Sequence, residues 1–312
     1  MTAVSETTPI EPASAEQTVA VKAESPFRRF VSDFCESKVA ILGFFGFVVI
    51  LFIAIFAPWI SPTNPYDLAT VDVLDSRLAP GEKMMSGKTA YLGTDGLGRD
   101  MLSAMFYGLR ISLGVGVMSG VIALCFGVTV GLAAAYFGGR VDTIIMRIVD
   151  IQLSFPAILI ALVLLATLGK GVDKIIIALI VVQWAYYART VRGSALVERS
   201  KEYIEAANCL ALSHKRVVFK HLLPNVMPPL IVVGTVQTAS AIALEATLSF
   251  LGVGLPQTEP SLGLLIANGF DYMLSLKYWI SFYPGLALLL TIIAINLVGD
   301  QLRDVLNPRL QK

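Results

Sequence analysis

Residues 39–60 read VAILGFFGFVVILFIAIFAPWI, an apolar run without a single charged side chain. As an α-helix with a rise of ~1.5 Å per residue, this run is about 33 Å long, which is enough to cross the hydrocarbon core of a bilayer. Lipid offers the backbone no hydrogen-bond partners, so a segment that crosses it has to be helical. The run therefore predicts an integral membrane protein.

Five further apolar stretches fit a bilayer in the same way, at residues 111–137, 148–168, 175–188, 226–251 and 278–298. The stretch 175–188 is short, but it can extend to about residue 195 if Arg189 snorkels to the membrane surface. The chain is 55% hydrophobic and only 15% charged, which is too apolar for an ordinary soluble domain. The predicted fold is an all-α membrane protein with six transmembrane helices.

The polar residues of the chain do not indicate a catalytic or metal site. A net charge of +1 provides no basic excess to neutralise phosphates, so nucleic acid is not an expected partner. His214 and His221 are the only histidines, and the three cysteines are scattered, so no metal is expected. Residues 169–171 read GKG but lack the remaining residues of a phosphate-binding P-loop. An intramembrane enzyme would need a paired nucleophile or a metal cluster, and we expect neither, nor a bound cofactor.

The distribution of Lys and Arg predicts the orientation of the chain in the membrane. With the N-terminus inside, cytoplasmic segments hold sixteen of the 24 basic residues and external segments hold eight. The positive-inside rule therefore places both termini in the cytoplasm, together with the polar, basic loop at 196–224. Residues 1–26 are rich in Ser, Thr, Glu, Ala and Pro, and we expect them to form a flexible cytoplasmic tail.

The second half of this basic loop, residues 205–224, reads EAANCLALSHKRVVFKHLLP. In a helix, Tyr203, Ala207 and Leu210 fall on one face, and Glu205 lies nearly opposite. The two adjacent alanines keep this helix thin, so the backbone of another protein could approach it closely. The pattern predicts a short helix that is suited to docking.

A second short helix is expected to follow, with Ser213 as its N-cap and His221 near its end. Pro224 then closes the loop, Asn225 is expected to cap the fifth span, and the prolines at 228–229 fall in its first turns, where backbone N–H groups lack partners. Two short helices at an angle would form a knob that fits a groove on a partner. The alternative is a solvated basic connector, which any membrane protein can have.

The longest external segment, residues 61–110, ends in the sequence LGTDGLGRD at 92–100. Asp100 is well placed to be the N-cap of the helix that leads into the second span, because its carboxylate is favourable at the positive helix end. This structural role is favoured over direct contact with a substrate. Arg99 and Asp100 are candidate residues of an external gate.

Three polar side chains inside the predicted spans, Asp150, Gln183 and Glu245, need partners because burial of a charge in lipid is costly. Asp150 is expected to form a local ion pair with Arg147, one turn earlier, and a role in the translocation pathway is the alternative. Glu245 is expected to form hydrogen bonds near Ser249 at the external gate. Direct contact of Glu245 with a substrate is the alternative.

The basic loop resembles the cytoplasmic coupling loop of permease subunits in binding-protein-dependent ABC importers, which docks onto an ATPase subunit. The resemblance rests on Glu205-Ala206-Ala207, on Leu223-Pro224 and on the spacing between them. Ala211 stands where that family usually has glycine. If this position needs a positive φ, alanine would strain it by about 1 kcal/mol.

Other stretches resemble the peptide/nickel class of these permeases, specifically the second of its two non-identical subunits. They are LGTDGLGRD at 92–100, YGLRIS at 107–112, EATLSFLG at 245–252, PSLG at 260–263 and NLVGDQLRD at 296–304. The resemblance implies the type I ABC importer permease fold. It implies an N-terminal segment with the first span (27–60), the external segment (61–110), a transmembrane domain (111–300) and a C-terminal tail (301–312).

The resemblance also implies partners and a location. The expected assembly, in a bacterial inner membrane, is a heterodimer with a second permease, two cytoplasmic ATPase subunits that bind ATP and Mg, and an extracytoplasmic binding protein. The implied substrate is a di- or oligopeptide, with nickel chelates, glutathione or opines as alternatives. A secondary transporter or channel would need intramembrane charges along a path and helices broken near the middle of the membrane, and few of either are expected in this chain.

Overall fold

The computed structural model describes residues 25–67 and 71–306, so most of the predicted N-terminal tail lies outside the described residues. The regular structure in these ranges is helical, with two isolated β-bridges in the external segment. The helices are α1 (Pro26–Glu36), α2 (Lys38–Ile60), α3 (Met101–Phe137), α4 (Gly139–Ser154), α5 (Ala157–Leu168), α6 (Val172–Arg199), α7 (Glu202–Cys209), α8 (His214–Arg216), α9 (Leu223–Phe250), α10 (Leu262–Phe270) and α11 (Trp279–Val305). A π-helical stretch, Val217–Leu222, joins α8 to α9.

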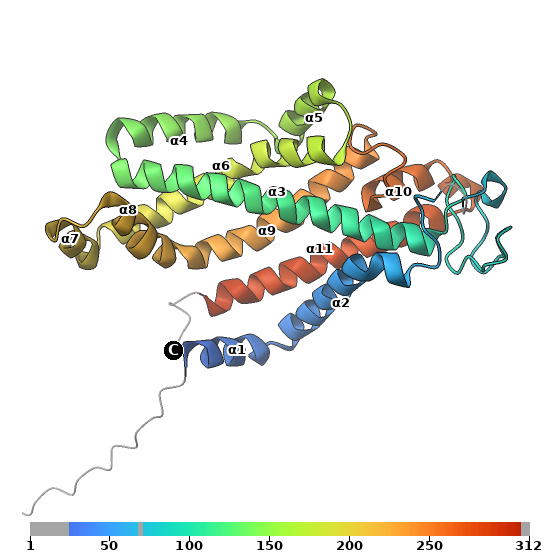
Figure 1. Cartoon of the computed structure of the whole chain (residues 1–312), viewed down its shortest axis with the longest axis horizontal. Coiled ribbons are helices and arrows are strands. Elements are labelled where there is room, and N and C mark those ends of the chain that lie inside the picture. The colour runs from blue at the N-terminus through green and yellow to red at the C-terminus, as the bar shows by residue number, and fades with distance from the viewer. Residues whose placement is uncertain (1–24, 68–70, 307–312) are drawn as a thin grey trace, which may run out of the picture.

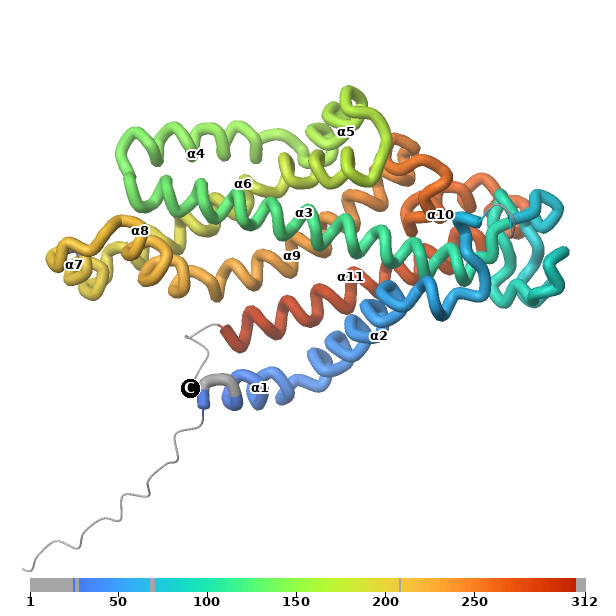
Figure 2. Tube along the Cα trace, in the orientation of Figure 1, coloured from blue at the N-terminus to red at the C-terminus, as the bar shows by residue number. Residues whose placement is uncertain are grey.

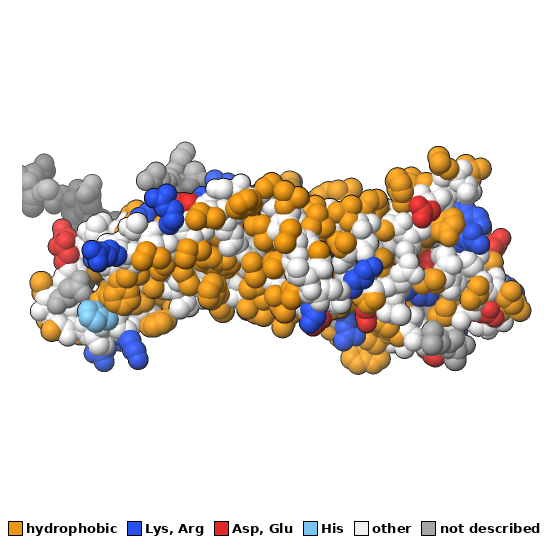
Figure 3. Space-filling view, turned by 90° about the horizontal axis from the view of Figure 1, so that it is seen from above, with side chains coloured by type: hydrophobic (Ala, Val, Ile, Leu, Met, Phe, Trp, Pro, Cys, Tyr) orange, Lys and Arg blue, Asp and Glu red, His pale blue; other side chains and the backbone are white. Residues whose placement is uncertain are grey.

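The long helices run along one axis of an elongated bundle (Figure 1). The external segment and α10 lie at one end of the bundle, and α7 and α8 lie at the other end. Helix α1 and the last turns of α11 lie in the half of the molecule that carries α7. Figure 3 shows a broad hydrophobic band along the middle of one face, with basic side chains nearer the ends.

Five helices of the described chain are long and apolar enough to cross a membrane: α2, α3, α6, the continuous helix His214–Phe250, and α11. Helices α4 and α5 pass the same test only as a pair and are bent by 90° relative to each other, which gives up to six spans if the pair counts as one. The predicted third span, 148–168, is therefore not a straight helix. Figure 2 shows the turn between the two helices.

Pro156 explains this break. The residue before a proline is sterically kept out of the α region, and Phe155 is extended, with φ −94° and ψ 142°. Pro156 also lacks the N–H that would continue the hydrogen-bond ladder of α4. The first helix therefore ends at Ser154, and a new one begins at Ala157.

The start of the fifth span also differs from the prediction. The helix is continuous from His214, so Asn225 is not its N-cap. The Asn225 side-chain amide instead donates to His221 O at 2.7 Å and to Tyr203 Oη at 3.0 Å. Pro224 lies in the first turn of α9, where its missing N–H leaves the carbonyl four residues earlier without its usual partner. The π-helical stretch Val217–Leu222, which is wound more widely than an α-helix, directly precedes this turn and accommodates the missing hydrogen bond.

Helices α3 and α6 share the most extensive helix–helix contact among the described residues. Two glycines of α3 make this approach possible. A Cβ atom on Gly127 would lie 2.6 Å from Trp184 O, and one on Gly131 would lie 2.6 Å from Ala188 O. Small residues at a helix contact let two backbones approach closely, as is common in membrane proteins.

Candidate functional site

The basic loop folds as α7, a tight turn and α8, and it has its own small core. Ile204, Ala207 and Val217 are all at most 5% exposed and pack together, with Tyr136 of α3 and Leu212 against them. The prediction that Ala207 and Leu210 lie on one face of the helix is wrong, since Ala207 is 5% exposed and Leu210 is 74% exposed. Ala207 fills the interior of the loop.

The outer surface of the loop carries both charged and apolar side chains. Glu205 and Ala206 are exposed on α7, and Leu210 and Phe219 are large exposed apolar side chains nearby in the chain. Exposed basic residues follow at Lys215, Arg216 and Lys220. Aromatic and arginine side chains such as Phe219 and Arg216 are enriched at protein–protein interfaces, whose rim is polar.

Side-chain hydrogen bonds fasten the loop to the membrane helices. The Tyr203 hydroxyl donates to Glu198 Oε1 of α6 at 2.6 Å and accepts from Asn225 of α9. Burial raises the pKa of Tyr203 to about 12, and the hydrogen bond to Glu198 contributes to the shift, so the hydroxyl stays protonated at neutral pH. Tyr136 Oη at the end of α3 lies 2.6 Å from His214 Nδ1. A displacement of the loop would therefore be passed to α3, α6 and α9.

Ala211 adopts the left-handed conformation, with φ +53°, two residues after Cys209, the last residue of α7. Here the Leu212 N–H donates to the Ala207 carbonyl at 3.2 Å. Helices commonly end at a residue of this conformation, which is usually glycine because a Cβ atom is strained there. The positive φ that the family's usual glycine implied is confirmed.

Ala211→Gly is expected to stabilise the loop by about 1 kcal/mol, because glycine removes the Cβ strain at positive φ. Hydrogen exchange of the α7 amides in the purified protein measures the gain as slower local opening. Ala206→Gly, on the exposed face of α7, is the matched control and should have the opposite sign, with a loss of about 1 kcal/mol. Equal effects of both changes would contradict the assignment.

At the opposite end of the molecule, Asp100 is the N-cap of α3, as predicted. Its Oδ2 accepts from the Ser103 backbone N–H at 2.8 Å and from the Ser103 hydroxyl at 2.6 Å. Asp100 is 1% exposed, so its side chain is engaged in the fold of this end of the bundle.

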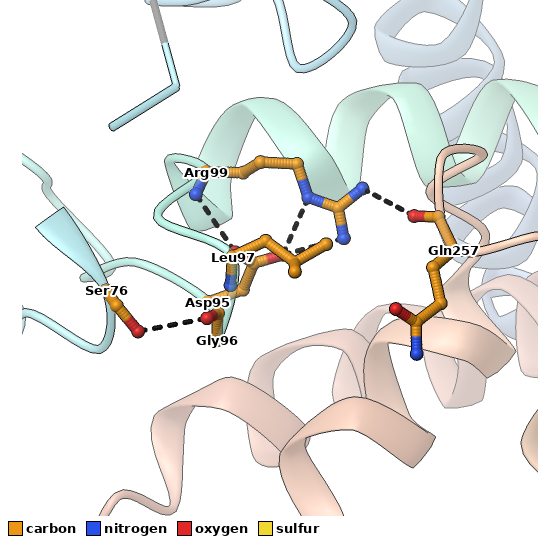
Figure 4. Close-up of polar contacts among 6 residues, drawn as sticks. All are labelled: Ser76, Asp95, Gly96, Leu97, Arg99 and Gln257. Atoms are coloured by element: carbon orange, nitrogen blue, oxygen red, sulfur yellow. Dashed lines mark hydrogen bonds and ion pairs between the residues drawn. The ribbon is translucent and has the colours of Figure 1, made fainter. Parts of the chain in front are cut away.

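Arg99 forms a buried ion pair with Asp95 (Figure 4). Arg99 Nε and one terminal nitrogen each lie 2.7 Å from Asp95 Oδ2, while Asp95 Oδ1 accepts from the backbone N–H groups of Leu97 and Arg99. The other terminal nitrogen donates to Gln257 O at 3.2 Å. Arg99 thereby joins the external segment to the connection between α9 and α10.

Glu245 lies in α9, is 0% exposed, and accepts from two hydroxyls at 2.8 Å each, those of Ser249 and Ser112. The structure brings Glu245 and Ser249 together, as predicted from the sequence. Ser112 of α3 was not predicted as a partner of Glu245. Its only signal in the sequence is a hydroxyl group near the start of the apolar run 111–137. These bonds link α3 to α9 close to the external segment.

Asp150 pairs with Arg189 of α6 at 2.5 Å, so the predicted pair with Arg147 is wrong. Helix α4 packs along α6, which brings the two side chains together from 39 residues apart. Gln183 of α6 is buried, and its amide has no hydrogen-bond partner among the described residues.

Two cavities adjoin this part of α6. One of about 510 Å³ lies between α5, α6 and α9 and is lined by Gln183, Ser240 and Thr247 among others. A larger one of about 730 Å³ lies towards the basic loop, between α6, α9 and α11. Both are lined by Tyr186 and Gln237, so the two cavities are neighbours along the α6–α9 face.

Comparison with known proteins adds two family matches. Residues 127–312 match the binding-protein-dependent transport system inner membrane component, and residues 25–80 match the N-terminal TM domain of oligopeptide transport permease C. The inward-facing methionine ABC transporter MetNI has a similar fold, with a TM-score of 0.55 and 20% identity over 66% of this chain and 98% of that chain.

Curated relatives match over nearly the whole chain. The di/tripeptide transport system permease protein DppC of Pseudomonas aeruginosa is 38% identical and covers 92% of this chain and 93% of its own. The dipeptide transport system permease protein DppC of Escherichia coli K12 is 41% identical over 92% and 95%. The oligopeptide transport system permease protein OppC of Bacillus subtilis is 36% identical over 97% of both chains.

Proposed function

We infer, from the premise that this chain belongs to the family of binding-protein-dependent transport system inner membrane components, that it is the permease subunit of a peptide ABC importer. The names of its relatives favour a di- or oligopeptide over nickel chelates, glutathione or opines. The apolar helices make it a multi-pass membrane protein, and its relatives support the bacterial inner membrane.

The basic loop is the docking element for a cytoplasmic ATPase subunit in this proposal. The observation that carries it is the fastening of the loop to three membrane helices, through Tyr203, Asn225 and the Tyr136–His214 contact. ATP and Mg would bind to the partner subunits, and closure of those subunits would move the loop. The arrangement of α1, α7 and the end of α11 in one half of the molecule supports a location of these segments on the same side of the membrane (Figure 1). The excess of Lys and Arg on that side favours the cytoplasm.

The α6–α9 face is proposed to form half of the translocation pathway, completed by a second permease. Its cavities combine apolar walls with Tyr186, Gln237 and the amide of Gln183, which has no hydrogen-bond partner in the described part of the chain. A peptide backbone needs hydrogen-bond partners when it leaves water, and such side chains can provide them. An extracytoplasmic binding protein would deliver the peptide at the external end, where Arg99, Asp100 and Glu245 hold the parts of the gate together.

Replacing Glu205 with alanine is expected to weaken ATPase docking roughly tenfold to a hundredfold, because a charge-assisted hydrogen bond from the partner is worth about 1.5–3 kcal/mol. The measurements are co-purification of the ATPase subunits and uptake of a labelled dipeptide into proteoliposomes. The change lies outside the spans, so membrane insertion should be unaffected.

Glu202→Ala is the matched control, since Glu202 is an exposed carboxylate in the first turn of the same helix. Wild-type docking in both variants would exclude a role for Glu205. A loop on the outer side could not reach the ATPase at all, so docking also tests the orientation. An assembled wild-type transporter that takes up no dipeptide would instead contradict the proposed substrate class.

A further inference from the structure

A separate cavity of about 440 Å³ lies at the external end of the molecule, between α3 and the first turn of α6. Below its rim, its wall is entirely apolar and consists of Ile111, Gly114, Val115, Met118, Val172 and Ile176. Met118 is 53% exposed, and Val121, one turn further along α3, is also 53% exposed. The cavity therefore opens towards an apolar face of α3.

The rim of the cavity has a different character. It is formed by Tyr66, Tyr107 and Arg110. The two tyrosine rings meet edge to face, with centroids 5.5 Å apart. The Tyr66 hydroxyl donates to Glu259 Oε2 at 2.8 Å, which brings a carboxylate to the same place. Burial, followed by the hydrogen bond to Glu259, raises the pKa of Tyr66, so this hydroxyl keeps its proton.

Arg110 marks the depth of this rim relative to the membrane. It is the last charged residue before the uncharged run 111–137, so it stands at the boundary between headgroups and hydrocarbon. Arg110 is exposed and forms no ion pair with any residue in the described ranges. An unpaired guanidinium at this depth is well placed to bind a phosphate oxygen.

We propose that this cavity binds one phospholipid whose headgroup carries both a phosphate and an ammonium group. Arg110 binds the phosphate, the ammonium lies between Glu259 and the faces of the two tyrosines, and the acyl chain lies along α3. Tyrosine faces and a carboxylate are both attractive to an ammonium ion. The opposite charges of Arg110 and Glu259 match the two charges of such a headgroup.

A zwitterionic peptide could satisfy the same two charges, but it does not fit the lower part of the cavity. A peptide backbone placed there would leave its N–H and C=O groups without hydrogen-bond partners, whereas an acyl chain has none to satisfy. The position of the cavity beside the exposed apolar face of α3 also favours an occupant from the bilayer.

Gly114 allows the lower part of the cavity to be filled without disturbing the bundle. A Cβ atom at this position would meet no atom within 4 Å, in contrast to Gly127 and Gly131 on the same helix. Gly114→Leu therefore places a side chain in the open space, and Gly114→Ala makes the same backbone change with little added volume. Comparison of the two variants separates the effect of filling the cavity from the effect of replacing glycine.

The test is native mass spectrometry of the full-length chain, purified with its co-purifying partners and titrated with phosphatidylethanolamine or phosphatidylglycerol of identical acyl chains. The wild type is expected to retain one phosphatidylethanolamine at a concentration about tenfold below that needed for phosphatidylglycerol. Arg110→Gln should weaken retention of both lipids roughly tenfold to a hundredfold. Glu259→Gln should weaken only that of phosphatidylethanolamine.

Gly114→Leu should abolish retention of this lipid, and Gly114→Ala should match the wild type. Wild-type retention in Gly114→Leu would overturn the proposal, as would equal retention of the two lipids by the wild type. Displacement of the lipid by a dipeptide would show that the rim binds the substrate, and this result would overturn the proposal as well. If Gly114→Leu fails to assemble, the different effects of Arg110→Gln and Glu259→Gln on the two lipids decide the question.

Discussion

Arg99→Ala is expected to destabilise the external segment by about 3–5 kcal/mol, because it leaves the buried carboxylate of Asp95 without its counter-charge. Both side chains of this pair are at most 3% exposed, so water cannot replace the lost partner. The contact from Arg99 to Gln257 O is lost at the same time. Hydrogen exchange of the amides at 92–100 measures the effect as a lower free energy of local opening.

Lys174→Ala provides the control. Its ion pair with Asp173 lies outside the apolar run 175–188, with an N–O distance of 2.9 Å, and the two side chains are 36% and 69% exposed. An exposed pair of this kind contributes only about 0–1 kcal/mol, because water solvates the remaining charge. A loss of the same size in both variants would mean that burial does not determine the strength of the Arg99–Asp95 pair. Asp95→Ala combined with Arg99→Ala should recover part of the stability, because it removes the unpaired charge.

The sequence predicted the features at the external end that depend on neighbouring residues. Asp100 could be identified as the N-cap of α3 because its partner, Ser103, lies three residues away. The pair between Arg99 and Asp95 was not predicted, since it depends on a turn rather than on helical spacing. Its contact with Gln257 joins residues 158 positions apart, and no local pattern indicates such a distance.

In the membrane helices, too, features that depend on neighbouring residues were predicted, and contacts between distant residues were not. The apolar runs predicted the spans, but the break in the third one depends on Pro156, which the hydropathy pattern does not register. Asp150 was assigned to Arg147 by local spacing, whereas the packing of α4 along α6 brings it to Arg189. Glu245 was predicted to meet Ser249 on its own helix, but its second partner, Ser112, comes from α3.

In the basic loop, helical periodicity grouped residues by face but did not identify which face points inwards. Ala207 was placed on the same helical face as Leu210, yet it packs against Val217 inside the loop. The positive φ of Ala211 was suggested by the family's usual glycine rather than by any local pattern. The role of the loop therefore depends on an interior that the sequence alone did not distinguish from its surface.

Ala207→Trp is expected to unfold the loop and abolish ATPase docking. The site is 5% exposed and enclosed by Ile204, Val217 and Tyr136, so an indole ring cannot enter without displacing them. Over-packing of a core typically costs about 1–3 kcal/mol, and an increase from alanine to tryptophan should reach or exceed the upper end of that range. Hydrogen exchange of α7 in the purified chain, together with co-purification of the ATPase, measures the two consequences.

Ala206→Trp separates this mechanism from a clash with the partner. Ala206 is exposed on the same helix, so the indole ring should leave the loop folded and obstruct only a protein that docks there. Fast exchange of α7 in Ala207→Trp and normal exchange in Ala206→Trp, with docking impaired in both, would place Ala206 in the interface and Ala207 beneath it. Normal exchange and normal docking in both variants would mean that α7 neither needs a packed interior nor contacts the ATPase.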